Sequence, residues 1–189
     1  GARRNHRMTR RVTLRRCARL DFGNGGGLFV HGTAELIDTH FIECLSGWAA
    51  GAFATHEPLS LTMTGGSIKR CTSYSTISTS IGVIEIASGS SVNLVGVELS
   101  DGVSMMGTSI KTRGTLRMTH CRLLRMGPAG GSGYRGWSGA LDVVGGTTTL
   151  EDTFIEGYTP NLDHSSIAPA DGWVGSWTGV WAEIVWDPD

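Results

Sequence analysis

Two stretches far apart in the chain repeat one pattern: "GGGLFVHGTAELIDTHFIEC" at residues 25–44 and "SGALDVVGGTTTLEDTFIEG" at residues 138–157. Each begins with glycine and a short apolar segment, passes through a turn, and ends in a second apolar segment with an aromatic-isoleucine-glutamate triplet. A repeat of a few tens of residues indicates a solenoid or another array, in which each copy is one structural unit. The two stretches therefore indicate that the chain contains further copies of the same unit.

Further copies lie between and around these two. Their second segments alternate apolar and polar residues, which indicates β-strands. Residues 12–20 resemble a degenerate second segment, and residues 179–186 resemble the start of one more copy. The first segments all begin with glycine and occupy residues 27–31, 51–55, 82–86, 107–111 and 139–143.

The copies can be aligned on the bulky residue late in each second segment. The residue five positions earlier is mostly apolar, and the residue three positions before that is small. A unit of two or three short strands cannot bury its apolar face alone, but strands stacked in parallel about 4.8 Å apart share one core. We therefore predict an all-β fold, a right-handed parallel β-helix of about five to six coils. Its expected inward column is Phe41, Ile68, Leu99, Leu123 and Phe154.

The coil pattern of residues 26–44 resembles the right-handed parallel β-helices of the pectin-lyase-like superfamily. The most similar members are the irregular repeats of polymorphic outer-membrane-type and adhesin-like surface proteins. The resemblance covers about residues 11–157 and implies the fold and an extracellular or cell-surface location. It implies no single activity, because the superfamily includes lyases, hydrolases, adhesins and phage tailspikes. The hydrolase Gly-His-Gly signature and the lyase calcium-binding aspartates are absent from this sequence.

We expect one β-helix domain over residues 1–189, with a basic arm at 1–11, recognisable coils at 12–157 and a tryptophan-rich coil or cap at 158–189. The chain has 28 glycines and only five prolines, which indicates many tight turns and excludes collagen. No apolar run is long enough for a membrane helix. The start at Gly1 leads us to interpret the chain as a segment of a longer one.

Charged residues two positions after the bulky anchors alternate in sign. Opposite charges on neighbouring coils attract, and each exposed pair contributes a few tenths of a kcal/mol. Such a ladder therefore matters more for register than for strength. The predicted ladder is Glu43, Arg70, Asp101, Arg125 and Glu156.

The four cysteines have no zinc-finger spacing. Cys44 and Cys71 lie one position after the ladder on adjacent coils, about 4.8 Å apart, within the ~4.4–6.8 Å between Cα atoms that a disulfide needs. A disulfide and two reduced thiols packed as small apolar groups are equally compatible with this spacing. Cys17 and Cys121 are expected to share an inward position four coils apart and to stay free.

Catalytic groups are weakly indicated. Glu85 and Asp142 share one first-segment position two coils apart, about 9–10 Å, close to the ~6.5–9.5 Å between the carboxyl groups of an inverting glycosidase. Ile110 is expected between them, and no third acid or histidine is placed nearby. We therefore favour surface carboxylates over a catalytic pair.

Metal and cofactor sites are not expected. His31 and His56 end neighbouring first segments, and with Glu57 they form a possible metal set, but histidines at turns are commoner than ligands. "GSGYRG" at 131–136 matches a dinucleotide-binding pattern, yet it lies in a predicted loop without the required strand before and helix after.

Four tryptophans gather near the C-terminus. Flat aromatic rings stack on sugars or anchor protein interfaces, and they also cover the open end of a solenoid. We favour a plug or an intermolecular contact over a glycan platform. The four are Trp173, Trp177, Trp181 and Trp186.

Arginine is concentrated at the start of the chain, although the net charge is -1. A basic arm can bind an anionic polymer, but this one lacks the interleaved aromatic residues that stack on bases, so nucleic acid is not an expected partner. We favour a first coil whose arginines meet water or an acidic neighbour. Eight of the sixteen cationic residues are involved: Arg3, Arg4, Arg7, Arg10, Arg11, Arg15, Arg16 and Arg19.

Three functions follow from these observations. The favoured one is a structural or adhesive solenoid module that presents loops for protein or glycan contacts in a surface or filamentous assembly. The alternative is a domain that binds or cleaves polysaccharides. Binding of an anionic polymer through the arginine arm ranks third. The expected partners are accordingly other protein chains or a glycan.

Overall fold

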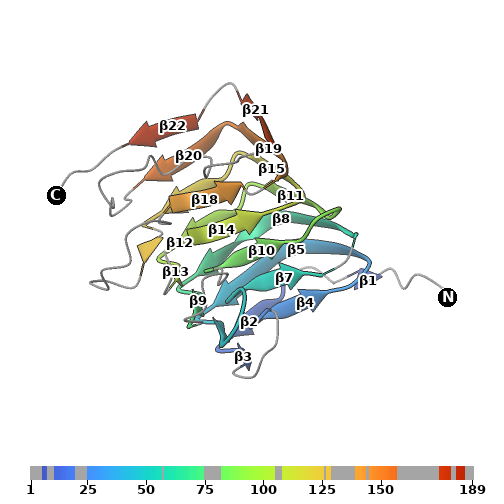
Figure 1. Cartoon of the computed structure of the whole chain (residues 1–189). Coiled ribbons are helices and arrows are strands. Elements are labelled where there is room, and N and C mark those ends of the chain that lie inside the picture. Colours follow the sequence, from blue (N-terminus) through green and yellow to red (C-terminus); the bar gives the residue numbers. More distant parts are fainter. Residues whose placement is uncertain are drawn as a thin grey trace.

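The computed structural model contains only strands, turns and bends in the part of the chain it describes, and every strand pairing there is parallel (Figure 1). The fold is therefore an all-β parallel solenoid, as predicted; its right-handed sense stays a prediction. No helix in the described ranges is long and apolar enough to cross a membrane. The structure describes residues 6–7, 11–19, 25–56, 58–74, 82–104, 108–125, 127–128, 139–143, 145–156, 175–179 and 182–185.

The strands form three sheets. Sheet B holds β3 (Ala18–Arg19), β6 (Leu45–Ser46), β9 (Thr72–Ser73), β13 (Val103–Ser104) and β17 (Gly127–Pro128). Sheet C holds β4 (Leu28–Val30), β7 (Phe53–Thr55), β10 (Ile84–Ile86), β14 (Thr108–Thr112) and β18 (Gly139–Val143). Sheet A holds β1 (His6–Arg7), β2 (Thr13–Arg15), β5 (Thr33–Ile42), β8 (Ser60–Lys69), β11 (Ser91–Val95), β12 (Glu98–Ser100), β15 (Thr115–Thr119), β16 (Arg122–Leu124), β19 (Gly146–Glu151), β20 (Thr153–Glu156), β21 (Gly175–Gly179) and β22 (Ala182–Val185).

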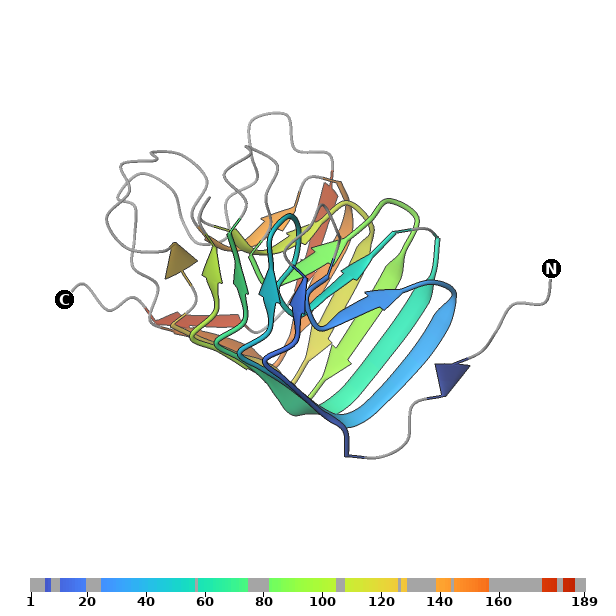
Figure 2. The ribbon, with the colours of Figure 1, turned by 90° about the horizontal axis from the view of Figure 1, so that it is seen from below.

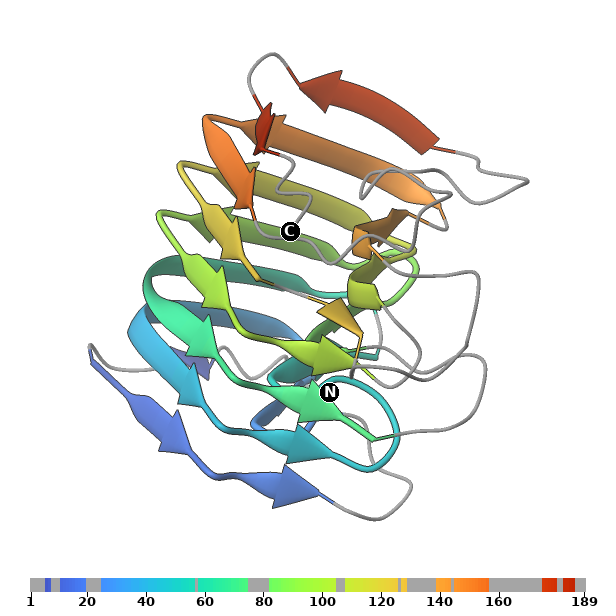
Figure 3. The same ribbon diagram turned by 90° about the vertical axis from the view of Figure 1, so that its left-hand side faces the viewer.

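The chain visits sheets C, A and B in turn and then returns to sheet C one level further along the stack. Figure 3 shows these successive levels in the order of the chain, and Figure 2 shows the strands of neighbouring levels side by side. Complete coils, with a strand in every sheet, run from β4–β6 to β14–β17 among the described residues. The expected five to six coils are therefore too many, because the levels at both ends of the stack lack a described strand in one or two of the sheets.

The core consists of inward columns that continue from coil to coil. Strand pairing joins Leu14, Phe41, Ile68, Leu99 and Leu123 in one column, each directly above the last. The last four of these side chains are at most 1% exposed. Burying a side chain of this size stabilises the fold by about 1.5–3 kcal/mol, so the column is a principal source of stability. A second column contains Leu36, Met63, Leu94, Met118 and Leu150.

The first column continues from Leu123 to Ile155, and the prediction of Phe154 at this position is wrong. Leu123 pairs with Ile155, whereas Phe154 pairs with Arg122. Asp38 and Asp152 both have a left-handed backbone that bends the chain within sheet A, with φ of 46° and 45°. Only one residue separates Asp152 from Phe154, whereas two separate Asp38 from Phe41. A change of one residue reverses the direction of every following side chain. Ile155 is accordingly 1% exposed. Phe154 instead contacts Arg122, whose Cζ lies 5.8 Å from the centroid of the Phe154 ring.

One bend, at the end of sheet A, recurs in five coils. Its residues all have φ between 49° and 57°, a left-handed conformation that non-glycine residues rarely adopt and that costs about 1 kcal/mol or more. Its recurrence at one level-to-level position indicates that the same turn carries the chain from sheet A to sheet B each time. The residues are Arg16, Glu43, Arg70, Asp101 and Arg125.

The corrected register makes a prediction about stability. Ile155→Ala removes a buried side chain and is expected to lower the free energy of unfolding by about 2–5 kcal/mol. Phe154→Ala removes a larger but outward side chain and is expected to cost about 1 kcal/mol. Urea unfolding of both variants measures the difference, and a larger loss for Phe154→Ala would show that Phe154 occupies the core.

Candidate functional site

One outward row of positions on sheet C contains two acidic residues and a lysine. Strand pairing places Phe29, Ala54, Glu85, Lys111 and Asp142 in consecutive coils at one position. Glu85 and Asp142 thus share a row two coils apart, as the repeat suggested, at about 9.6 Å for two steps of 4.8 Å. For Asp142 the structure describes only the backbone, so only its position in the row is used.

The residue between them is Lys111, and the expectation of Ile110 there is wrong. Ile110 pairs with Ile84 and Leu141, and all three are buried in the core. Lys111 therefore places a cation between the two acids, in the row that faces outward. The prediction aligned Ile110 with Glu85, one residue away from the observed register, and a shift of one residue moves a side chain to the opposite face of a strand.

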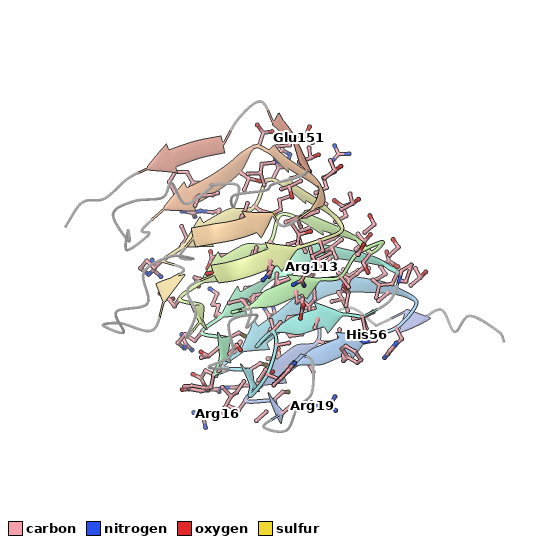
Figure 4. All side chains as sticks on the ribbon, viewed as in Figure 1. Arg16, Arg19, His56, Arg113 and Glu151 are labelled. Carbon is pink, nitrogen blue, oxygen red and sulfur yellow. The ribbon has the colours of Figure 1, made fainter. Side chains whose placement is uncertain are left out.

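Glu85 is largely buried, with 18% of its side chain exposed. Its Oε1 lies 3.2 Å from Nη1 of Arg113. Arg113, labelled in Figure 4, directly follows β14. Burial raises the pKa of Glu85 above its ordinary value, and attraction to Arg113, Lys111 and His56 opposes that rise. A carboxyl with a raised pKa beside cations can hold or release a proton nearer to neutral pH.

Three rings lie at the N-terminal side of the same face. The ring centroids of Phe29 and His31 are 4.6 Å apart, and that of His56 lies 5.7 Å from Phe29 and 6.0 Å from His31. The two histidines end neighbouring strands, and both are exposed. Glu57, the third member of the possible metal set, lies outside the described residues. Where the structure describes the chain, no three His, Cys, Asp or Glu residues converge as metal ligands.

Four residues of the predicted charge ladder lie at the sheet A–sheet B bend and make ion pairs there. Glu43 Oε1 lies 3.0 Å from Nη2 of Arg70, and two bonds of 2.7 and 3.1 Å join Arg125 to Asp101. Arg125 holds the pKa of Asp101 below its ordinary value, chiefly by hydrogen bonding, and Arg70 adds a weaker attraction. The ladder therefore connects coils by contacts between opposite charges.

The two ends of the ladder differ from the prediction. Arg16 joins it at the start, with Nε 2.9 Å from Glu43 Oε2, and lowers the pKa of Glu43 together with Arg70. Arg15 also approaches Glu43, at 3.8 Å, so two of the early arginines do meet an acidic neighbour. Glu156 is one position out of this row, because Leu124, not Arg125, is its partner. The same one-residue slip that displaces Phe154 displaces Glu156.

Further ion pairs join neighbouring coils on sheet A. Nζ of Lys69 lies 2.7 Å from Glu98, and Nη2 of Arg117 lies 2.7 Å from Glu151. Figure 4 labels Arg16 near one end of the stack and Glu151 near the other, so side-chain pairs of this kind occur along much of its length. His120 and Asp152 make a similar contact of 3.3 Å at the bend inside sheet A.

The expectation that Cys17 and Cys121 share one inward position is wrong. The residues after Cys17, Cys44 and Cys71 pair with one another in three adjacent coils, which puts these three thiols in one row. Cys121 occupies a different row, just before β16, and all four thiols are free. The predicted Cys44–Cys71 neighbourhood is therefore present, and Cys17 adds a third member that the sequence analysis missed.

The thiols in this row influence one another. Hydrogen bonding from Cys71 lowers the pKa of Cys44 to about 6, and the same contact, together with burial, raises the pKa of Cys71. Burial and the charge of Cys44 raise the pKa of Cys17. Cys44 is therefore the member that most readily becomes a thiolate, the reactive form of cysteine.

Most of the tryptophan group lies beyond what the structure describes. Trp177 belongs to β21, where its backbone pairs with Thr148. Trp173, Trp181 and Trp186 lie outside the described residues. The expected plug or contact surface stays a prediction.

No family model, no curated protein and no solved structure matches this chain. The fold class accordingly rests on strand pairing alone, and the pectin-lyase-like resemblance stays a prediction.

The ladder makes a prediction about salt. Arg70→Glu places a carboxylate between Glu43 and Asp101 and is expected to lower the unfolding temperature by roughly 2–4 °C at low salt. Since salt screens exposed charges, the loss should shrink near ~1 M NaCl. Arg70→Gln, which removes attraction without adding repulsion, is the control. Equal losses at both salt concentrations would show that Arg70 acts by packing.

Glu85 makes a prediction about pH. Because its pKa is raised in the folded state, its favourable contribution is complete below the ordinary carboxyl pKa of 4.5 and is lost as pH rises through the folded-state value. Glu85→Gln should remove this fall, so the stability of the variant relative to the unmodified protein should increase as the pH rises from the ordinary carboxyl pKa of 4.5 towards neutral.

Unfolding temperatures across that range test the effect. Glu151→Gln is the control with the opposite sign, because Arg117 holds the pKa of Glu151 below its ordinary value. A difference between Glu85→Gln and the unmodified protein that does not change with pH would refute the raised pKa.

Proposed function

We propose that the chain is a structural or adhesive solenoid module that holds its outward faces in fixed positions for contacts with other protein chains or glycans. The observation that carries this proposal is the unbroken inward column from Leu14 to Ile155. A stack in which each coil contacts only its neighbours is a rod whose cross-section stays constant as coils are added. Such a rod spaces outward groups evenly and suits a surface or filamentous assembly.

The ion pairs between coils support the same role. The Arg16–Glu43–Arg70 contacts and the Asp101–Arg125 contact lie on one edge of the rod. Exposed pairs add little free energy, so their main effect is to favour one register of coil on coil. A rod that must present its surface in one arrangement benefits from that selectivity.

The family proposed for this module is the pectin-lyase-like superfamily, in its adhesin-like branch. Its support is the coil pattern of residues 26–44, together with the parallel solenoid into which that pattern folds. An extracellular or cell-surface location belongs to this proposal.

A polysaccharide-binding or polysaccharide-cleaving domain is the second candidate, and one observation favours it. Glu85 and Asp142 share the outward row of sheet C, Glu85 has a raised pKa, and Phe29 offers an aromatic ring on the same face. An acid of raised pKa paired with an ionised one is the arrangement that hydrolyses glycosidic bonds. Lys111 between the two acids opposes this function, because it holds a cation where the substrate would bind.

Binding of an anionic polymer through the early arginines has less support. Arg15 and Arg16 approach Glu43, so part of their charge is already neutralised within the stack.

Release of reducing or unsaturated ends from pectin, alginate and other glycans tests the proposal. A structural module should release none above a heat-denatured sample. Release that Glu85→Ala or Asp142→Ala abolishes would overturn the proposal in favour of the second candidate. Glu151→Ala is the matched control, because it removes a carboxylate on another sheet that is also ion-paired, to Arg117.

A further inference from the structure

Cys17, Cys44 and Cys71 form a column at the corner between sheets A and B, where Cys44 and Cys71 belong to the core and Cys17 packs against it. They lie at one position of three consecutive coils, immediately before β3, β6 and β9, and are spaced evenly by 27 residues. The pairings Ala18–Leu45 and Leu45–Thr72 fix their register. Neighbouring members are therefore about 4.8 Å apart at Cα, inside the ~4.4–6.8 Å range of a disulfide.

The three side chains point the same way. Each sulfur lies near the carbonyl oxygen two residues earlier: Cys17 to Arg15 at 3.9 Å, Cys44 to Ile42 at 3.7 Å and Cys71 to Lys69 at 3.6 Å. This repeated contact places the sulfurs in one row, with neighbouring sulfurs one coil apart. Cys44 Sγ also lies 3.2 Å from the carbonyl oxygen of Leu14, in the coil of Cys17.

Access to the column is graded. Cys71 is 0% exposed and Cys44 is 1% exposed, whereas Cys17 is partly exposed. On the far side of Cys71 the same position holds Gly102, which has no side chain, because Thr72 pairs with Val103. Among the described thiols of the column, Cys17 is therefore the one that a dissolved reagent contacts first.

We propose that this column is a redox site at which a small disulfide, such as glutathione disulfide, is reduced while one intrachain disulfide forms between Cys44 and either Cys17 or Cys71. The Cys17 thiolate attacks the small disulfide, forms a mixed disulfide and releases one small thiolate. The Cys44 thiolate then attacks Cys17 Sγ and releases the second. Two protein thiols lose two electrons and two protons, and the small disulfide becomes two thiols.

Thiol exchange then moves the bridge along the column. When Cys71 gives up its proton and attacks Cys44 Sγ, a Cys44–Cys71 disulfide forms and Cys17 takes up a proton as a free thiol, without further oxidation. Cys17 and Cys71 are two coils apart, about 9.6 Å, which is too far for a direct bridge. Cys44 is thus the partner common to both products, and one thiol of the three always remains free.

Peptide mapping tests this site, because trypsin places each cysteine in a separate peptide: residues 17–19, 20–69, 71–111 and 118–122. The folded protein is incubated with glutathione disulfide, alkylated without reductant and digested. The expected product carries two alkylated cysteines, Cys121 and one of the column, and one linked pair of peptides that contains Cys44.

Single substitutions separate the roles of the three thiols. Cys71→Ser should give only the Cys17–Cys44 bridge. Cys17→Ser should give only Cys44–Cys71, at least about tenfold more slowly, because the accessible thiol is lost. Cys44→Ser should give no intrachain bridge, and Cys121→Ser, the matched control, should leave the bridge unchanged.

Four alkylated cysteines after oxidation of the unmodified protein would overturn the proposal. A Cys17–Cys71 bridge, a bridge that contains Cys121, or disulfides only between chains would also overturn it. If Cys44→Ser fails to fold, as judged by circular dichroism, the products of Cys17→Ser and Cys71→Ser still decide whether Cys44 is the common partner.

Discussion

Each strand lies directly on its counterpart in the next coil, in parallel and in register, and the rest of the structure depends on this constraint. Backbone hydrogen bonds fix the level-to-level spacing, and the two-residue period of the strand fixes which side chains enter the core. A column such as Phe41–Ile68–Leu99 therefore forms because the same strand register recurs in each coil. The same repeated register places the charge ladder on the outer surface and the cysteine column at the corner between sheets A and B.

The environment that this stacking creates sets the chemistry of each carboxyl group. Contacts with cations lower the pKa of Glu98 and Asp101, whereas burial raises that of Glu85 despite its partner Arg113. Groups of the first kind stabilise the fold above their ordinary pKa and lose that contribution as pH falls. Glu85 behaves in the opposite way, because its surroundings favour the protonated form.

The repeated pattern was sufficient to predict the parallel stack, four of the five core anchors and four of the five ladder residues. It failed where the distance between a bend and an anchor changed: Asp152 lies one residue nearer to Phe154 than Asp38 does to Phe41. The triplet "FIE" occurs in both copies, but its phenylalanine is in the core column in one copy and its isoleucine in the other. The bend itself is the better reference point, because a left-handed residue resets the alternation.

Arg16 and Cys17 were missed for a different reason. They lie two and three residues after Leu14, at the positions of the ladder and of Cys44, and extending the alignment into residues 12–20 would have found both. Lys111 could not have been assigned in the same way. Its strand carries few bulky residues, so the apolar pattern alone leaves its direction undetermined.

The alternation of sign along the bend restricts how this rod can change its length. Removal of the level that contains Arg70 would bring Glu43 against Asp101, and duplication of that level would set two arginines face to face. Loss or gain of two adjacent levels preserves the sequence of signs. Growth and shortening of the rod by recombination should therefore be tolerated in even steps and selected against in odd ones.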